Sequence, residues 1–257
     1  RLGTSAIDLN RRNPAILAHM AATLDMMSGG RLIFGVGKGV WNEASYGYRL
    51  DKPVSRMRET IEVVKRFWTE PKVDHEGEFF TYKGASIGSK PLQKPHPPIW
   101  IAGFGPRMLR IAGALGDGFI TQHLPPEIYK EEIDKVRKRA KEAGKDPAKI
   151  GAAFATPIAV SPDRHKAQAL IEPGARRSLV RRARPPLLLA DRLGYRYPWH
   201  DPEDVPLEVI DRSFVFGIPD DCIEKVESYA RAGVDYFIAL PLLPEGVESL
   251  RLFAEKV

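Results

Sequence analysis

A short glycine-containing segment, Gly103-Phe104-Gly105-Pro106-Arg107, has the residue types and spacing of an anion-binding turn. It follows the apolar run 99–102 and precedes a helical pattern that opens with the proline. Glycine lets backbone N–H groups approach a phosphate closely, and the N-terminus of a helix favours negative charge. Any tight connection from a strand to a helix also uses glycine, so a plain turn is the alternative interpretation.

The other candidate functional residues lie in a second glycine-containing loop and in the later stretch 162–211. Lys38 and Gly39 end the apolar run 32–36, and Lys38 is either a cofactor contact or a solvated lysine. Trp41 is a candidate to cover a bound ring or substrate, and His200 is a candidate to line a substrate pocket. Packing and a structural role are the alternatives for these two. No spacing of His, Asp and Glu suggests a metal site.

The composition is that of an ordinary globular protein. Of the 257 residues, 43% are apolar and 28% are charged, which excludes disorder, collagen and a coiled coil. No uncharged apolar run reaches the roughly 18 residues of a membrane span, and nothing reads as a signal peptide. We therefore expect no membrane association and a cytoplasmic location. The single cysteine, Cys222, excludes a disulfide framework and a Cys-based zinc site.

The formal net charge of +6 comes partly from two basic clusters. The cluster at 135–141 is interleaved with acidic residues, as on a solvated helix face. The cluster from Arg176 to Arg184 has less compensation and could attract an anionic cofactor or a nucleic acid. No nucleic-acid-binding motif accompanies it, so we expect no nucleic-acid partner and keep a nucleic-acid-binding module only as an alternative.

Strand and helix patterns alternate along the chain, which predicts a parallel sheet joined by right-handed crossovers. The predicted strands are 1–7, 32–36, 99–102, 118–121, 151–160 and 233–239. The predicted helices are 14–28, 53–68, 106–115, 126–143, 220–232 and 245–257. Two excursions interrupt this alternation, a hairpin within 71–98 and a mostly helical stretch at 162–211.

The first predicted helix has a clear start, a repeating pattern and a clear end. Asn13 is a good N-cap and Pro14 suits the first turn, while Gly29 and Gly30 end the helix. Apolar residues recur at helical spacing at Ile16, Met20, Leu24 and Met27. His19 lies in the middle of this helix, and we interpret it as a residue of the helix face.

Three blocks in this order resemble the bacterial luciferase-like family. The first reads GTSAI at 3–7, RNPA at 12–15 and TLDMMSGGRLIFGVGKG at 23–39. The second contains IWIAGFGP and ALGDGFIT between 99 and 121, and the third contains GIP, AGVD and LP between 217 and 241. The blocks are most similar to the coenzyme F420-dependent branch, which includes F420-dependent dehydrogenases and methylenetetrahydromethanopterin reductases.

The resemblance implies one luciferase-like (β/α)8 TIM barrel over 1–257, with insertions at the two excursions. A closed barrel needs eight strands in about 250 residues. The six predicted strands and two excursions already use this length, so we expect the first two βα units to precede Arg1. The implied activity is hydride transfer between coenzyme F420 and a small organic substrate. An FMN-dependent monooxygenase on the same scaffold is the alternative, and a homodimer is the expected assembly.

The resemblance also implies where the cofactor lies. The family carries a non-prolyl cis peptide behind the (deaza)flavin ring, which falls at Ser5-Ala6, where small side chains leave room for the ring. The implied cofactor contacts are Ser5, Ala6, Asp8, Lys38, Gly39, Gly103, Phe104, Gly105, Arg107 and Met108. Val40 stands where sugar-phosphate dehydrogenases of the family carry Glu, which argues against that chemistry and leaves the catalytic acid or base open.

Overall fold

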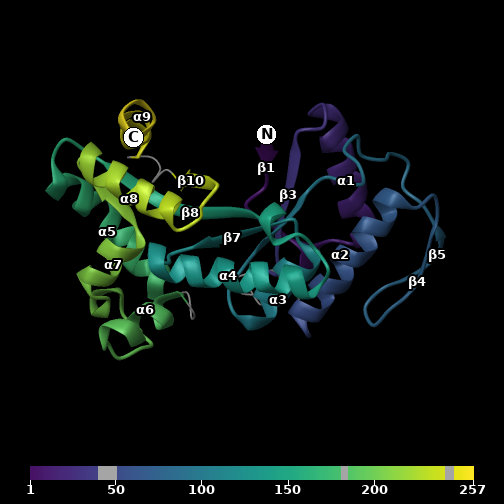
Figure 1. Cartoon of the computed structure of the whole chain (residues 1–257), viewed down its shortest axis with the longest axis horizontal. Coiled ribbons are helices and arrows are strands. Elements are labelled where there is room, and N and C mark those ends of the chain that lie inside the picture. Colours follow the sequence, from purple (N-terminus) through teal and green to yellow (C-terminus); the bar gives the residue numbers. More distant parts are fainter. Residues whose placement is uncertain (40–50, 181–184, 241–245) are drawn as a thin grey trace. The chain divides into compact units, whose positions relative to one another are not determined.

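The computed structural model describes residues 1–39, 51–180, 185–240 and 246–257, and these form two compact units. The first unit comprises Arg1–Ile120 and Val136–Ile150, and the second comprises Thr121–Lys135 and Gly151–Val257. Both are α/β structures with parallel strands, which confirms the fold class expected from the alternating pattern (Figure 1).

The first unit is built on a parallel sheet. β1 and β2 both pair with β3, which pairs with β6, which in turn pairs with β7. These strands are β1 (Leu2–Gly3), β2 (Ile7–Asp8), β3 (Leu32–Gly37), β6 (Ile99–Ala102) and β7 (Gly118–Gln122). β3 is apolar along its whole length and almost entirely buried, as a strand covered on both faces requires.

The helices of the first unit begin as the sequence predicts. They are α1 (Pro14–Met27), α2 (Pro53–Thr69) and α3 (Pro106–Leu115), with short 3-10 helices η1 (Leu9–Arg11) and η3 (Pro147–Lys149) and the second half of α4 (Pro126–Glu142). Each α-helix that begins in this unit has proline in its first turn. The N–H groups of the first turn have no acceptor within the helix, so proline, which lacks an N–H, costs no hydrogen bond there. Asn13 caps α1 through Oδ1, which accepts from the backbone N–H of Ala15 at 2.9 Å.

The large apolar residues of α1 do not lie on its buried face. Ile16, Met20, Leu24 and Met27 are all exposed, and Met27 reaches 81%. The buried face consists of Pro14, Leu17, Ala18, Ala21, Ala22 and Asp25. The small alanines let α2 approach closely, so that the indole N–H of Trp68 donates to the carbonyl of Ala18 at 2.8 Å. The helical spacing therefore predicts the helix correctly but not the side that faces the core.

The predicted opening strand is divided into β1 and β2, which pair with successive parts of β3 and are separated by a short segment that lies close to Gly35. The hydroxyl of Thr4 donates to the carbonyl of Gly35 at 2.7 Å, and a Cβ at position 35 would overlap the carbonyl oxygen of Thr4. Only glycine permits this approach of two backbones. The following peptide bond, Ser5–Ala6, is cis, as the family resemblance implies.

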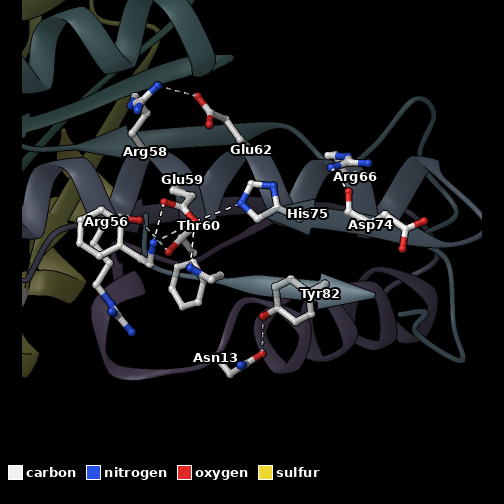
Figure 2. Close-up of polar contacts among 12 residues, drawn as sticks. Asn13, Arg56, Arg58, Glu59, Thr60, Glu62, Arg66, Asp74, His75 and Tyr82 are labelled. Carbon is white, nitrogen blue, oxygen red and sulfur yellow. Dashed lines mark hydrogen bonds and ion pairs between the residues drawn. The ribbon is translucent and has the colours of Figure 1, made fainter. Parts of the chain in front are cut away.

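The predicted hairpin is present, and a buried carboxylate attaches it to α2. β4 (Val73–Glu76) and β5 (Thr81–Ala85) are antiparallel. Glu59 of α2 has only 7% of its side chain exposed and accepts from His75 Nε2 at 3.0 Å. It also accepts from the backbone N–H groups of Phe79 at 3.1 Å and Phe80 at 2.9 Å. Figure 2 shows Glu59 and His75 pointing toward one another.

The second unit is built around β8 (Gly151–Val160), which pairs in parallel with β9 (Val215–Gly217) and β10 (Tyr236–Leu240). Its helices are α5 (Arg164–Val180), α6 (Pro185–Leu193), α7 (Leu207–Ser213), α8 (Pro219–Arg231), α9 (Val247–Lys256) and the first half of α4, with the 3-10 helix η4 (Pro202–Asp204). The stretch 162–211 is mostly helical, as predicted, and contains α5, α6 and most of α7. β9 was not predicted because it is three residues long and has no alternating pattern.

The second basic cluster is partly neutralised within the second unit. Arg176 pairs with Glu172 at 2.6 Å and donates to the carbonyl of Pro202 at 3.1 Å. Arg181, Arg182 and Arg184 lie outside the described residues. Among the described helices, none is long and apolar enough to cross a membrane.

We expect Glu59→Gln to destabilise the protein by about 1–3 kcal/mol at neutral pH, because the amide cannot accept all the bonds that the buried carboxylate accepts. Glu62→Gln is the matched control. Glu62 is 39% exposed and pairs with Arg58 one turn along the same helix (Figure 2), where such pairs contribute below 1 kcal/mol. Urea unfolding of both variants checks the prediction, and equal losses would contradict it.

The same carboxylate predicts a pH dependence. Burial alone would raise the pKa of Glu59, but the hydrogen bonds from His75, Phe80 and Phe79 outweigh it and lower the pKa below 4.5. A carboxylate whose pKa is lower in the folded than in the unfolded protein stabilises the fold at pH values above its unfolded-state pKa. This stabilisation is lost as the pH falls through the folded-state pKa. The stability difference between wild type and Glu59→Gln should therefore shrink below about pH 4.5, and a constant difference down to acid unfolding would contradict this assignment.

We expect Gly35→Ala to destabilise the protein by about 1–3 kcal/mol or more, because the carbonyl it would meet is backbone and cannot move aside cheaply. Gly3→Ala is the control in the neighbouring strand, where a Cβ would stand 3.9 Å from Ile33, an ordinary contact distance. Thermal unfolding should separate the two, with Gly3→Ala close to wild type. Equal stability of the two variants would show that the contact between Thr4 and Gly35 is looser than described.

Candidate active site

The carboxyl ends of three neighbouring strands meet at one edge of the first unit's sheet. Gly37 of β3 is the register partner of Asp8 on β2 and of Ala102 on β6. The segments next to these strand ends carry residues singled out from the sequence: Ser5, Ala6 and Asp8 around β2, Lys38 and Gly39 after β3, and Gly103 to Met108 after β6. Active sites of parallel α/β barrels are built at this edge, so the cofactor-binding candidates of the first unit belong to strands that end side by side.

Small residues form a flat, uncharged surface at this edge. A Cβ on Gly37 would stand 3.8 Å from the Cβ of Ala102 and 3.9 Å from the Cβ of Ala6. Ser5 and Ala6 are exposed, and Ala102 is half-buried. A planar ring can lie against such a surface, whereas a larger side chain at any of these positions would fill the same space. We call Ala6, Gly37 and Ala102 the apolar floor.

A polar turn after β2 fixes the loop that follows β3. Asp8 Oδ1 accepts from the backbone N–H of Asn10 at 2.9 Å, and Oδ2 pairs with Arg11 Nε at 2.8 Å. Gly39 has φ +82 and lies so close that a Cβ there would clash with the Asp8 carboxylate. Asp8 therefore uses its carboxylate within the turn and packs against the backbone of Gly39. Lys38 is half-buried, and its Nζ donates to the carbonyl of Gly39 at 3.2 Å.

Asn10 is a residue of this turn that sequence reasoning missed. Its Nδ2 donates to the carbonyl of Lys38 at 2.8 Å and to the carbonyl of Pro53 at 3.3 Å. It thereby joins the end of β3 to the start of α2. Its Oδ1 is buried and has no hydrogen-bond partner among the described residues. The local sequence gives no signal for this role, because both acceptors are backbone atoms far along the chain.

The loop after β6 presents the free N-terminus of α3. Gly105 is the N-cap, with φ +88, and no side chain caps the helix. The first turn of α3 contains no acidic residue. Arg107 is exposed and donates from Nη2 to the hydroxyl of Ser55 at 3.2 Å. Uncapped N–H groups at a helix start, with an arginine in that turn, have the chemistry of an anion site.

Met108 and Phe104 complete the loop. A Cβ on Gly103 would stand 2.9 Å from the Cε of Met108, so the methionine packs against the glycine and is itself buried. Phe104 is half-buried. The structure thus brings together the segments that carry all ten cofactor-binding candidates.

The two catalytic candidates, Trp41 and His200, stay predictions. Trp41 lies outside the described residues, as does Val40. His200 belongs to the second unit and is exposed beside the buried Trp199, so its catalytic role stays a prediction. His19 is exposed on α1, consistent with a helix-face residue. Within the described ranges, no cluster of three or more His, Cys, Asp or Glu could hold a metal ion.

The chain is similar to curated enzymes over much of its length. It is 28% identical to the 5,10-methylenetetrahydromethanopterin reductase of Archaeoglobus fulgidus, over 100% of this chain and 82% of that protein. It is 32% identical to the F420-dependent glucose-6-phosphate dehydrogenase of Mycolicibacterium gilvum, over 93% of this chain and 72% of that protein. A 40% identical match to a phthiodiolone/phenolphthiodiolone dimycocerosates ketoreductase of Mycobacterium sp. strain JLS covers 58% of this chain and only 40% of that relative.

Solved structures agree on the fold. The coenzyme F420-dependent tetrahydromethanopterin reductase from Methanopyrus kandleri superposes with a TM-score of 0.85 at 24% identity, over 100% of this chain and 82% of that one. An F420-dependent secondary alcohol dehydrogenase in complex with an F420-acetone adduct gives a TM-score of 0.80 at 25% identity, over 99% of this chain and 78% of that one. The sequence profile described as luciferase-like monooxygenase matches residues 1–236. The chain therefore belongs to the luciferase-like monooxygenase family.

Proposed function

We propose that the protein is a coenzyme F420-dependent oxidoreductase that transfers a hydride between the deazaflavin and a small organic substrate. The observation that carries the proposal is the pairing of an apolar floor, formed by Ala6, Gly37 and Ala102, with the uncapped N-terminus of α3 on the strand next to β3. A planar ring and a phosphate on one molecule match these two features. The F420-dependent relatives named above give independent support.

The residues divide between the two parts of the cofactor. The apolar floor would face the ring, and the backbone N–H groups after Gly105 would bind the phosphate together with Arg107. Lys38 and Arg107 add positive charge, which suits the acidic tail of F420. The cofactor supplies the hydride chemistry, and the protein contributes orientation and electrostatics. At this edge Ser5 and Ala6 are exposed, so a ring would meet the floor from the side of Ala6.

FMN is the alternative cofactor, because it also combines a planar three-ring system with a phosphate. A type II Baeyer–Villiger monooxygenase in complex with FMN shares the fold, with a TM-score of 0.75 at 22% identity. A nucleic-acid-binding module has less support, since Arg176 is engaged within the second unit. A homodimer and a cytoplasmic location stay predictions.

The choice of cofactor is tested by titrating the protein separately with F420 and FMN while following tryptophan fluorescence. We expect saturable binding of F420 at least about tenfold tighter than that of FMN, a difference of about 1.4 kcal/mol. Because phosphate contacts are electrostatic, the affinity for F420 should fall as the salt concentration rises. Tighter binding of FMN would favour the monooxygenase alternative, and binding of neither would reject the proposed function.

The phosphate assignment is tested by Gly105→Ala, which should weaken F420 binding about tenfold, because a side chain there obstructs the approach to the start of α3. Alanine at positive φ also costs about 1–2 kcal/mol of stability. Gly84→Ala controls for that cost, because Gly84 has φ +56 with nothing within 4 Å of a Cβ. Both variants should lose similar stability, but only Gly105→Ala should lose affinity. Equal affinity of the two variants would make the glycine turn a plain connection.

A further inference from the structure

An arginine near the start of α2 lies beside the anion site proposed at the start of α3. Arg107 of that site donates to the hydroxyl of Ser55 at 3.2 Å, and Arg56 is the next residue along α2. Neighbouring Cα atoms are about 3.8 Å apart, so Arg56 belongs to the immediate surroundings of the site. All three residues lie in the first unit. Sequence reasoning did not single out Arg56.

Two phenylalanine rings hold the side chain of Arg56 in place. Its Cζ lies 4.6 Å from the centre of the Phe80 ring and 5.8 Å from that of Phe79. A guanidinium packed over an aromatic ring is attracted to it and keeps its N–H groups available in its own plane. The rings are themselves held, because the backbone N–H groups of both phenylalanines donate to the buried carboxylate of Glu59. The guanidinium is therefore positioned before any ligand binds.

The Arg56 guanidinium has no carboxylate partner among the residues that the structure describes, and no dashed line reaches it in Figure 2. The other arginines of α2 do have such partners. Arg58 pairs with Glu62 at 3.3 Å, and Arg66 pairs with Glu70 at 2.8 Å. A guanidinium offers five N–H donors. Those of Arg56 can therefore bind an anionic group of a ligand.

The carboxylates of an oligoglutamate chain suit this position. The cofactor phosphate is already assigned to the start of α3, so a second anion on the same molecule is supplied by its tail. F420 carries an acidic glutamate tail beyond its phosphate, whereas FMN ends at the phosphate. A guanidinium binds a carboxylate through two parallel hydrogen bonds, a geometry that suits Arg56. Glu78 of the hairpin does not compete, because it pairs with Lys52.

We propose that Arg56 binds a carboxylate of the oligoglutamate tail of coenzyme F420 and so forms a subsite beside the phosphate site. This inference rests on the proposed function and assigns a further part of the same cofactor. The tail does not react, so the subsite contributes to affinity and leaves the chemistry of the ring unchanged. Once the phosphate is bound, the contact with the tail is intramolecular, which raises the overall affinity.

The test measures the dissociation constants of two forms of F420, one without glutamate and one with several, by tryptophan fluorescence at low salt. The wild type should bind the glutamate-bearing form about tenfold more tightly, as expected for charge-assisted hydrogen bonds. Arg56→Gln should abolish this preference and leave the dissociation constant of the other form unchanged. Both constants come from one variant, so a general loss of folded protein cancels in their ratio. Arg56→Lys keeps the charge and should recover part of the preference.

The matched control is Arg58→Gln, which removes the same charge two residues further along α2. The Arg58 side chain is 57% exposed and pairs with Glu62. This variant should keep the wild-type ratio of the two dissociation constants.

Equal affinity of the wild type for the two forms would overturn the inference. An unchanged ratio in Arg56→Gln, or an equal loss in Arg58→Gln, would overturn it as well. Each of these results leaves the cofactor assignment intact, because the protein still binds F420. Failure of the wild type to bind either form is the separate outcome that removes the proposed function, and this inference with it.

Discussion

The close approach of two backbones, at Thr4 and Gly35, is the constraint on which the candidate site depends. Because position 35 has no side chain, the carbonyl of Thr4 can occupy the place that a Cβ would take. That placement puts Ala6 against Gly37 and Ala102, so the floor of the site is made of the smallest side chains. The steric demand of one backbone carbonyl thus sets the shape of the surface proposed to face the cofactor ring.

The polar groups around this floor mainly hold the protein's own loops. Asp8 uses both carboxylate oxygens within its turn, and Asn10 ties the end of β3 to the start of α2. These hydrogen bonds provide partners for polar groups whose burial without a partner would destabilise the protein. They leave positive charge at Lys38 and Arg107 and uncapped N–H groups at the start of α3. The site therefore combines a rigid polar support with an electrostatic preference for anions.

Local patterns in the sequence predicted most elements, because proline, asparagine and glycine mark helix ends and a continuous apolar run marks a buried strand such as β3. The family blocks added the cis peptide at Ser5–Ala6. Features set by contacts between distant segments were missed. The alanines of α1 bury their face only because α2 packs there, and Asn10 acts on carbonyls 28 and 43 residues away.

The difference in burial between side chains of the first unit has a consequence for divergence within the family. Because Arg107 is exposed and contacts Ser55 at the surface, its replacement carries little penalty in folding. Selection on ligand binding can then act on position 107 before any compensating change arises elsewhere. A buried, partnered residue such as Glu59 has no such freedom, since each substitution is first filtered by stability. Mutational tolerance should therefore be unevenly distributed, high at exposed side chains and low at buried side chains that join two elements.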